Sequence, residues 1–315
     1  MMQFAVMAAG FVLLVFGAQG LVKGSSSMAI RLGVPPLFVG LTIVAIGTST
    51  PELVVSVGSA LQGVGDVSVG NVVGSNIFNI AVILGITALI TPIRVSLSII
   101  KFDIPVMIAV SFVAAILFSK GEISRVSGVI LIVSLFAYFA ATFYFVRKEG
   151  LPENSGPAKK VSDKNGFLIV VDILFIVGGA LVLIVGSNLV VDAATNVAEA
   201  LGVSHALIGL TIVGMGTSIP EFATSIVAAF RKQPDMAIGN VVGSNIFNIL
   251  GVLGFSSLLT PLSAPGVGLI DWIVMVLFAI LLLPLAWTGK TLDRKEGAFF
   301  LLSYSLYIWW LWSAN

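Results

Sequence analysis

The strongest constraint on this chain is an internal duplication. Residues Gly70–Ile80 read GNVVGSNIFNI, and the same letters recur without change at Gly239–Ile249. The offset between the copies, 239 − 70 = 169 residues, also relates Glu52 to Glu221, since 221 − 52 = 169. The fold must therefore be built from two related halves that give the same motifs the same local structure.

Both halves are strongly apolar. Hydrophobic residues form 58% of the 315 residues and charged residues only 10%, against about a quarter charged in soluble proteins. Because a spanning helix needs about 20 mostly apolar residues, the chain is predicted to be an all-α, multi-pass membrane protein. The ten expected transmembrane helices are residues 2–22, 37–60, 67–91, 102–119, 126–146, 167–190, 205–230, 236–260, 267–288 and 297–313.

The number of spans predicts how the halves are related. Each half holds five spans, an odd number, so the second half should enter the membrane from the opposite side. We therefore expect two inverted-topology five-helix repeats, residues 1–146 and 167–315, joined by a cytoplasmic linker at 147–166. Inverted repeats are typical of secondary transporters, whose ion sites lie near the middle of the bilayer.

Charge predicts the orientation and excludes several classes of function. Of the 16 Lys and Arg residues, only Lys120 and Arg125 fall on one side of the predicted spans. The positive-inside rule makes the other side cytoplasmic, so both termini are expected outside the cytoplasm in a multi-pass cell-membrane protein. The first apolar run lacks a charged n-region and a cleavage site, so we expect it to remain as a helix. Nothing indicates a nucleic-acid partner or a nucleotide-binding loop, and the absence of cysteine excludes disulfides and thiolate chemistry.

A proline interrupts one central apolar span in each half. The two segments read AIGTSTPEL at 45–53 and GMGTSIPEF at 214–222. Proline removes a backbone donor and clashes with the preceding turn, so the helices should break just before Pro51 and Pro220. A break at that depth is tolerated only where it is buried or lines a cavity. We expect the carbonyls before each break to lack partners and to be available to a cation.

Glu52 and Glu221 follow these breaks directly. No Lys or Arg lies in the central segments to neutralise them, and an intramembrane acid usually marks function. Two carboxylates and the carbonyls of Thr48 and Thr217 offer six oxygens, which suits Ca²⁺. The alternative is that both acids are protonated and only hydrogen-bonded. A transition-metal site is disfavoured, because cysteine is absent and His205 is the one histidine.

The duplicated motif adds further oxygen ligands. Its glycines form small-xxx-small patterns that let helices approach closely. Ser75 and Asn79 are four residues apart and so share one helix face, while Asn76 lies off that face and, with Asn245, is expected to hydrogen-bond neighbouring backbone. The predicted metal ligands are Glu52, Glu221, Thr48, Thr217, Asn79, Asn248, Ser75, Ser244, Ser49 and Ser218.

The motifs G-T-S-x-P-E and G-S-N-I-F-N, each in two copies, resemble the alpha-repeats of the calcium/cation antiporters, in particular the prokaryotic sodium/calcium exchangers. The resemblance covers nearly the whole chain. It implies that Glu52 and Glu221 bind Ca²⁺ and Na⁺, and that the matching Thr, Ser and Asn residues complete one calcium and several sodium sites. It further implies Na⁺/Ca²⁺ antiport by alternating access, with Ca²⁺ and Na⁺ as substrates and no cofactor.

Two details of the motifs indicate the branch of that family. Some relatives have aspartate where Asn248 stands, and in the potassium-dependent branch that acid is tied to potassium, so asparagine favours potassium independence. Proton-coupled relatives have G-N-x-x-E in place of G-T-S-x-P-E, which favours sodium here. The linker at 147–166 is too short for the calcium-sensing loop of large eukaryotic exchangers.

The predicted mechanism follows from charge. Two bare carboxylates should make an empty transporter resist the inward–outward switch, whereas one Ca²⁺ or several Na⁺ would neutralise them. The first and sixth spans, with small-residue faces at Gly17–Gly24 and Gly186–Ser187, are the expected moving element, and the protein is expected to function as a monomer in the bilayer. The open alternatives are an H⁺/Ca²⁺ or other divalent-cation antiporter and a cation channel. An enzyme is not expected, because GVGD at 63–66 lacks the companion motif of intramembrane proteases.

Overall fold

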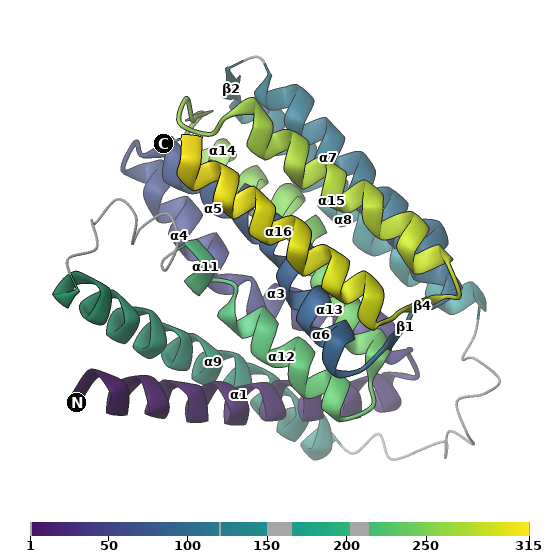
Figure 1. Ribbon diagram of the computed structural model, residues 1–315. Helices are drawn as coiled ribbons and strands as arrows, with labels where there is room; N and C mark the ends of the chain where they lie inside the picture. The colour runs from purple at the N-terminus through teal and green to yellow at the C-terminus, as the bar shows by residue number, and fades with distance from the viewer. Residues whose placement is uncertain (1, 120, 150–165, 202–213, 315) are drawn as a thin grey trace. The chain divides into compact units, whose positions relative to one another are not determined.

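The computed structural model describes residues 2–119, 121–149, 166–201 and 214–314. Almost all of these residues are helical (Figure 1). The chain divides into two compact units: unit 1 is Met1–Ser49 with Tyr138–Asn240, and unit 2 is Thr50–Ala137 with Val241–Asn315. Each unit therefore takes segments from both halves of the sequence.

Among the described residues, seven helices are long and apolar enough to cross a membrane. An eighth span results if Pro36–Thr48 and Thr50–Leu61, which flank a break, count as one. Of the ten expected spans, 205–230 lies partly outside the described residues. Residues 297–313 do form a helix, α16 (Arg294–Ala314), but it is not among the seven.

Unit 1 is built around two long helices, α1 (Met2–Leu32) and α9 (Gly166–Ala200), which lie side by side (Figure 1). A Cβ added at Gly17 of α1 would lie 2.9 Å from the carbonyl oxygen of Gly179, and one added at Gly179 would lie 2.8 Å from that of Gly17. The two backbones approach this closely only because neither residue has a side chain.

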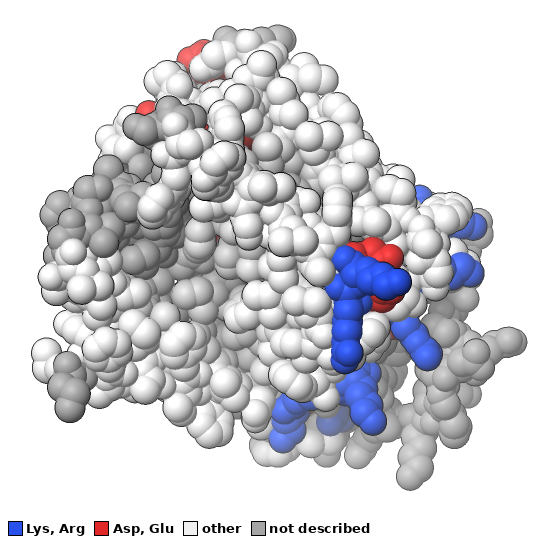
Figure 2. Space-filling model, in the orientation of Figure 1, with Lys and Arg blue, Asp and Glu red and all other residues white. Residues whose placement is uncertain are grey.

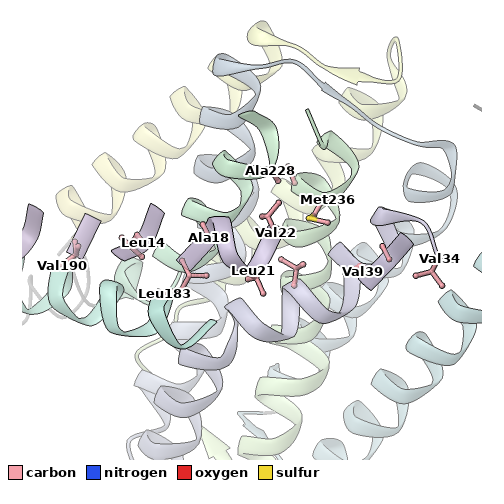
Figure 3. Packing of buried hydrophobic residues seen from close by; sticks show 13 residues of the cluster. Leu14, Ala18, Leu21, Val22, Val34, Val39, Leu183, Val190, Ala228 and Met236 are labelled. Carbon is pink, nitrogen blue, oxygen red and sulfur yellow. The ribbon is translucent and has the colours of Figure 1, made fainter. Parts of the chain in front are cut away.

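Shorter elements and the ends of two further helices complete unit 1. They are α2 (Pro36–Val39), the π-helical segment η1 (Gly40–Val44), α3 (Ala45–Thr48), α11 (Gly214–Gly216), α12 (Ile219–Phe230) and the ends of α8 (Arg125–Glu149) and α13 (Pro234–Phe247). Leu14, Leu21 and Val22 of α1 share one buried cluster with Leu183 of α9 and Met236 of α13 (Figure 3). This apolar core supports the start of α12, where Glu221 lies.

α1 extends ten residues beyond the expected span 2–22, so Lys23 lies within the helix. The helix continues because no residue breaks it before Gly33, which adopts φ +65°. The backbone N–H of Val34 then donates to Ala29 O at 3.0 Å and that of Gly33 to Ile30 O at 3.3 Å. These two bonds form the usual glycine C-cap.

Unit 2 contains the rest of both halves. From the first half come α4 (Thr50–Leu61), α5 (Gly65–Phe78), η2 (Asn79–Leu84), α6 (Gly85–Ile90), β1 (Ile93–Arg94), η3 (Ile99–Asp103), α7 (Ile104–Phe118) and β2 (Glu122–Ile123). From the second half come η5 (Asn248–Leu253), α14 (Gly254–Leu259), β3 (Leu262–Ser263), α15 (Leu269–Trp287), β4 (Thr291–Leu292) and α16. The strands pair antiparallel across the halves, with Ile93 opposite Leu292 and Ile123 opposite Leu262.

The sequence offset of 169 recurs in the secondary structure. α4 and α12 begin at 50 and 219, η2 and η5 at 79 and 248, and α8 and α16 at 125 and 294. The related sequences of the two halves therefore form the same local structure, including the uncommon π-helical turns at Asn79 and Asn248, which are frequent at functional sites.

Exposed Lys and Arg residues gather at one end of unit 2. Figure 2 shows largely uncharged surface, with Lys and Arg gathered where β1 and β4 pair and α16 begins. Arg94, Lys290, Arg294 and Lys295 are exposed in this region. All four belong to the charges that the sequence assigns to the cytoplasmic side.

Candidate cation-binding site

The predicted helix breaks are confirmed in both halves. Ser49 (φ −83°, ψ 11°) separates α3 from α4, and Ser218 (φ −87°, ψ 5°) separates α11 from α12. Pro51 and Pro220 lie in the first turns of the helices that follow. A proline at that position loses no helical hydrogen bond, because the first N–H groups of a helix have no partner within it.

The prediction that all carbonyls before the breaks lack partners is wrong at three positions. Ala45 O accepts from the Ser49 N–H at 2.9 Å and from Thr48 Oγ1 at 3.3 Å. In the second half, Met215 O accepts from the Ser218 N–H at 3.1 Å and Gly216 O from Ser187 Oγ at 2.7 Å. Each helix end is capped locally, because a buried carbonyl without a partner costs free energy.

In unit 1, the carboxylate of Glu221 is held by a residue of the other half. Ser49 Oγ donates a 2.7 Å hydrogen bond to Glu221 Oε1, and both residues are completely buried. A hydroxyl bound to an ionised oxygen forms a strong, charge-assisted hydrogen bond. The structure thus joins two of the predicted ligands directly.

Asn240 organises the same region, and sequence reasoning did not select it. Its Oδ1 accepts from Thr48 Oγ1 at 3.1 Å, and its Nδ2 donates to Glu221 O at 3.3 Å and to Ser225 Oγ at 3.0 Å. Asn240 therefore connects the predicted ligand Thr48 to the backbone that carries Glu221. The sequence feature that could have selected Asn240 is its polar side chain within the small-xxx-small motif Gly239–Gly243.

Unit 2 repeats this arrangement around Glu52. Asn71 Nδ2 donates to Glu52 O at 3.2 Å and to Ser56 Oγ at 2.9 Å, the same two contacts at the same offset of 169. Ser56 Oγ in turn donates to Ser68 O at 3.2 Å. Glu52 is completely buried. The backbone carbonyl of each glutamate thus accepts a hydrogen bond from an asparagine of the duplicated motif.

Four asparagines of the duplicated motif form a reciprocal network in unit 2. Asn76 Nδ2 donates to Asn245 O at 3.4 Å, and Asn245 Nδ2 donates to Asn76 O at 3.2 Å. Asn79 Nδ2 donates to Asn245 Oδ1 at 3.0 Å, and Asn248 Nδ2 to Asn76 Oδ1 at 3.2 Å. The prediction that Asn76 and Asn245 bond neighbouring backbone needs correction, because the carbonyls belong to the other half and side-chain amides are bonded as well.

All ten predicted ligands are buried. Ser75 Oγ, Asn79 Oδ1 and Asn248 Oδ1 have no hydrogen-bond partner among the described residues. Within those residues no group of three or more His, Cys, Asp or Glu side chains could hold a metal ion. The ten predicted ligands offer carboxylate, hydroxyl and amide oxygens. His205 lies outside the described residues.

Comparison with known proteins identifies the family. The sequence pattern described as sodium/calcium exchanger protein matches residues 2–145 and 171–313. The chain belongs to the sodium/calcium exchanger family. The match covers both halves and leaves out the whole linker at 147–166.

Individual members of this family are similar over nearly their whole length. CaxA of Alkalimonas amylolytica is 36% identical over 318 residues, which cover 97% of each chain. The sodium/calcium exchanger MaX1 of Methanosarcina acetivorans is 30% identical over 344 residues, again 97% of each chain. A solved structure of the sodium-calcium exchanger NCX_Mj is 33% identical, covers 97% of each chain and superposes with a TM-score of 0.84.

Family membership makes this protein a multi-pass membrane antiporter for Ca²⁺ and other cations, and not an enzyme. The GVGD segment has a structural role instead. Asp66 Oδ1 accepts a 2.7 Å hydrogen bond from the backbone N–H of Gly266 and so joins the first turn of α5 to the loop before α15.

Proposed function

We propose that this protein exchanges Na⁺ for Ca²⁺ by alternating access and does not require K⁺. The observation that carries the proposal is that each unit buries side-chain oxygens suited to a cation. In unit 1 these include the hydrogen-bonded Ser49 and Glu221, and in unit 2 the amide oxygens of Asn79 and Asn248, which have no partner among the described residues. Carboxylate, hydroxyl and amide oxygens are the ligands of hard cations such as Ca²⁺.

The residues proposed to bind the transported cations share burial, an oxygen ligand and a position at a helix break or in the duplicated motif. They are Glu52, Glu221, Thr48, Thr217, Ser49, Ser218, Ser75, Ser244, Asn79 and Asn248. When ionised, the two glutamates carry two negative charges, which one Ca²⁺ or several Na⁺ would neutralise. The loaded protein then reorients more easily than the empty one, because uncompensated charge inside a membrane is costly.

We also propose that the halves are inverted repeats, residues 1–146 and 167–315, of five spans each. The constant offset of 169 in the secondary structure supports this topology. The reciprocal bonds between Asn76 and Asn245 support it further, because a twofold axis requires each bond to occur twice. The exposed Lys and Arg residues near β1 and β4 support a cytoplasmic location for that end, with both termini outside.

The helix pair α1 and α9 is proposed to move during exchange. The two backbones approach closely at glycines: an added Cβ at Gly10 of α1 would lie 2.9 Å from Gly186 O of α9. Ser187 Oγ of α9 also bonds Gly216 O, next to the break before Glu221. Motion of the pair would therefore reach the proposed ligands in unit 1.

The function is tested by uptake of radioactive calcium into proteoliposomes loaded with Na⁺ and diluted into Na⁺-free, K⁺-free buffer. We expect uptake that requires internal Na⁺ and does not respond to a pH gradient. Uptake driven by the pH gradient alone would instead identify an H⁺/Ca²⁺ antiporter. Calcium flux without any counter-ion would identify a channel.

A further inference from the structure

The reciprocal asparagine network determines which atom each ligating amide can offer. A side-chain amide has one end that accepts hydrogen bonds and one end that donates them, whereas a backbone carbonyl can only accept. Asn245 Nδ2 lies 3.2 Å from Asn76 O, and Asn76 Nδ2 lies 3.4 Å from Asn245 O. Each of these two amides must therefore turn its nitrogen to the backbone and its oxygen away from it.

The orientation is passed on to the neighbouring asparagines. Asn76 Oδ1 is an acceptor and needs a donor, which is Asn248 Nδ2 at 3.2 Å. Asn245 Oδ1 likewise accepts from Asn79 Nδ2 at 3.0 Å. If either outer amide turned over, two carbonyl oxygens would face each other. The backbone carbonyls thus fix all four amides in one orientation.

The consequence is a pair of buried carbonyl oxygens without partners. Asn79 Oδ1 and Asn248 Oδ1 have no hydrogen-bond partner in the described part of the chain, and both residues are completely buried. A buried carbonyl without a partner is destabilising, and a bound cation would remove that cost. Both residues also begin π-helical segments, η2 and η5.

We propose that Asn76 and Asn245 are positioning residues that act on the ligand of the opposite half. Asn76 holds the amide of Asn248, and Asn245 holds the amide of Asn79, so that each offers oxygen rather than NH₂ to the transported cation. This inference rests on the proposed cation exchange. Residues that orient metal ligands typically contribute roughly 10–100-fold to metal affinity.

Because each positioning asparagine bonds the ligand of the opposite half, double variants distinguish a positioning role from a general packing role. Sodium-loaded proteoliposomes are prepared with Asn76→Leu alone, and with Asn76→Leu added to Asn248→Ser or to Asn79→Ser. We expect Asn76→Leu alone to raise the KM for Ca²⁺ about 10–100-fold. Asn76→Leu should raise the KM by a similar factor on the Asn79→Ser background. It should change the KM little on the Asn248→Ser background, because the Asn248 amide that Asn76 orients is absent there. Ser111→Ala, which removes a buried hydroxyl of α7 outside the network, is the control.

If Asn76→Leu fails to fold, Asn245→Leu provides a second test. Its effect on the KM should be lost on the Asn79→Ser background and kept on the Asn248→Ser background. An equal effect of Asn76→Leu on both serine backgrounds, or no effect on the KM, would overturn the positioning role while leaving the exchange function intact. Wild-type protein without Na⁺-dependent uptake would overturn the exchange function itself. A normal KM for Ser111→Ala is required for either conclusion.

Discussion

Ser49 Oγ donates a 2.7 Å hydrogen bond to Glu221 Oε1, although the two residues are 172 positions apart in the chain. Ser49 is the residue at which the first half breaks its helix, and Glu221 is the acid that follows the break in the second half. The duplication predicts each of these features separately, whereas their contact is a property of the folded unit 1.

Removing this bond should weaken ion binding without abolishing transport. A hydrogen bond to a charged group contributes about 1.5–3 kcal/mol, so Ser49→Ala is expected to raise the KM for Ca²⁺ roughly tenfold or more, with a smaller effect on the maximal rate. The measurement is calcium uptake at varied Ca²⁺ in sodium-loaded proteoliposomes. The control is Ser26→Ala on α1, which removes a hydrogen bond to Gln233 and should behave as wild type. Equal KM values for the two variants would contradict the role of Ser49.

Neutralising either glutamate should abolish exchange. Glu52→Gln and Glu221→Gln keep the shape of the side chain but remove the charge that holds the cation. A ligand that binds only the folded protein raises its melting temperature, so Ca²⁺ should stabilise the wild type and should not stabilise either variant. Asp66→Asn is the control and should retain uptake, because Asp66 only accepts a hydrogen bond from the backbone of Gly266. Full activity of Glu221→Gln would refute the proposed ligand set.

Two adjacent glycines of α9 give a matched test of the α1–α9 contact. A Cβ at Gly179 would lie 2.5 Å from Leu21 N of α1, whereas a Cβ at Gly178 would meet no atom within 4 Å. Gly179→Ala should destabilise the protein by about 1–3 kcal/mol through overpacking and slow transport. Gly178→Ala should be neutral or slightly stabilising, since alanine is the better helix former. Thermal unfolding in detergent distinguishes them, and identical melting temperatures would exclude close packing at Gly179.

The ion pair between Arg31 and Asp172 also joins α1 to α9. Arg31 Nε lies 2.5 Å from Asp172 Oδ2, and the Asp172 side chain is only 6% exposed. Arg31→Ala should lower the melting temperature by several degrees, because it leaves a buried carboxylate unpaired. The double variant Arg31→Ala/Asp172→Asn should recover part of that loss. A double variant less stable than Arg31→Ala would show that the charge of Asp172 is not the cause.

Much of the local structure could be predicted because it depends on residues close together in the chain. Pro51 and Pro220 disfavour a continuous helix wherever they occur, so the breaks at Ser49 and Ser218 follow from the sequence alone. Apolar runs of about 20 residues likewise predicted most of the long helices. The expected span 2–22 stops just before Lys23, whereas α1 continues to Leu32 and ends at Gly33 with its positive φ.

The sequence by itself therefore determined the duplication, the apolar spans, the helix breaks and the types of residue that we propose to bind cations. Only the tertiary structure decided which of those residues meet. Ser49 with Glu221, Asn79 with Asn245 and Asn248 with Asn76 are pairs separated by 166 to 172 residues. Helical periodicity predicts which side chains share a face, but it placed Asn76 off the face of Asn79, whereas both side chains donate to Asn245. It cannot predict hydrogen-bond partners on another helix, because these depend on how closely glycine-lined backbones approach and on which buried polar groups must then satisfy one another.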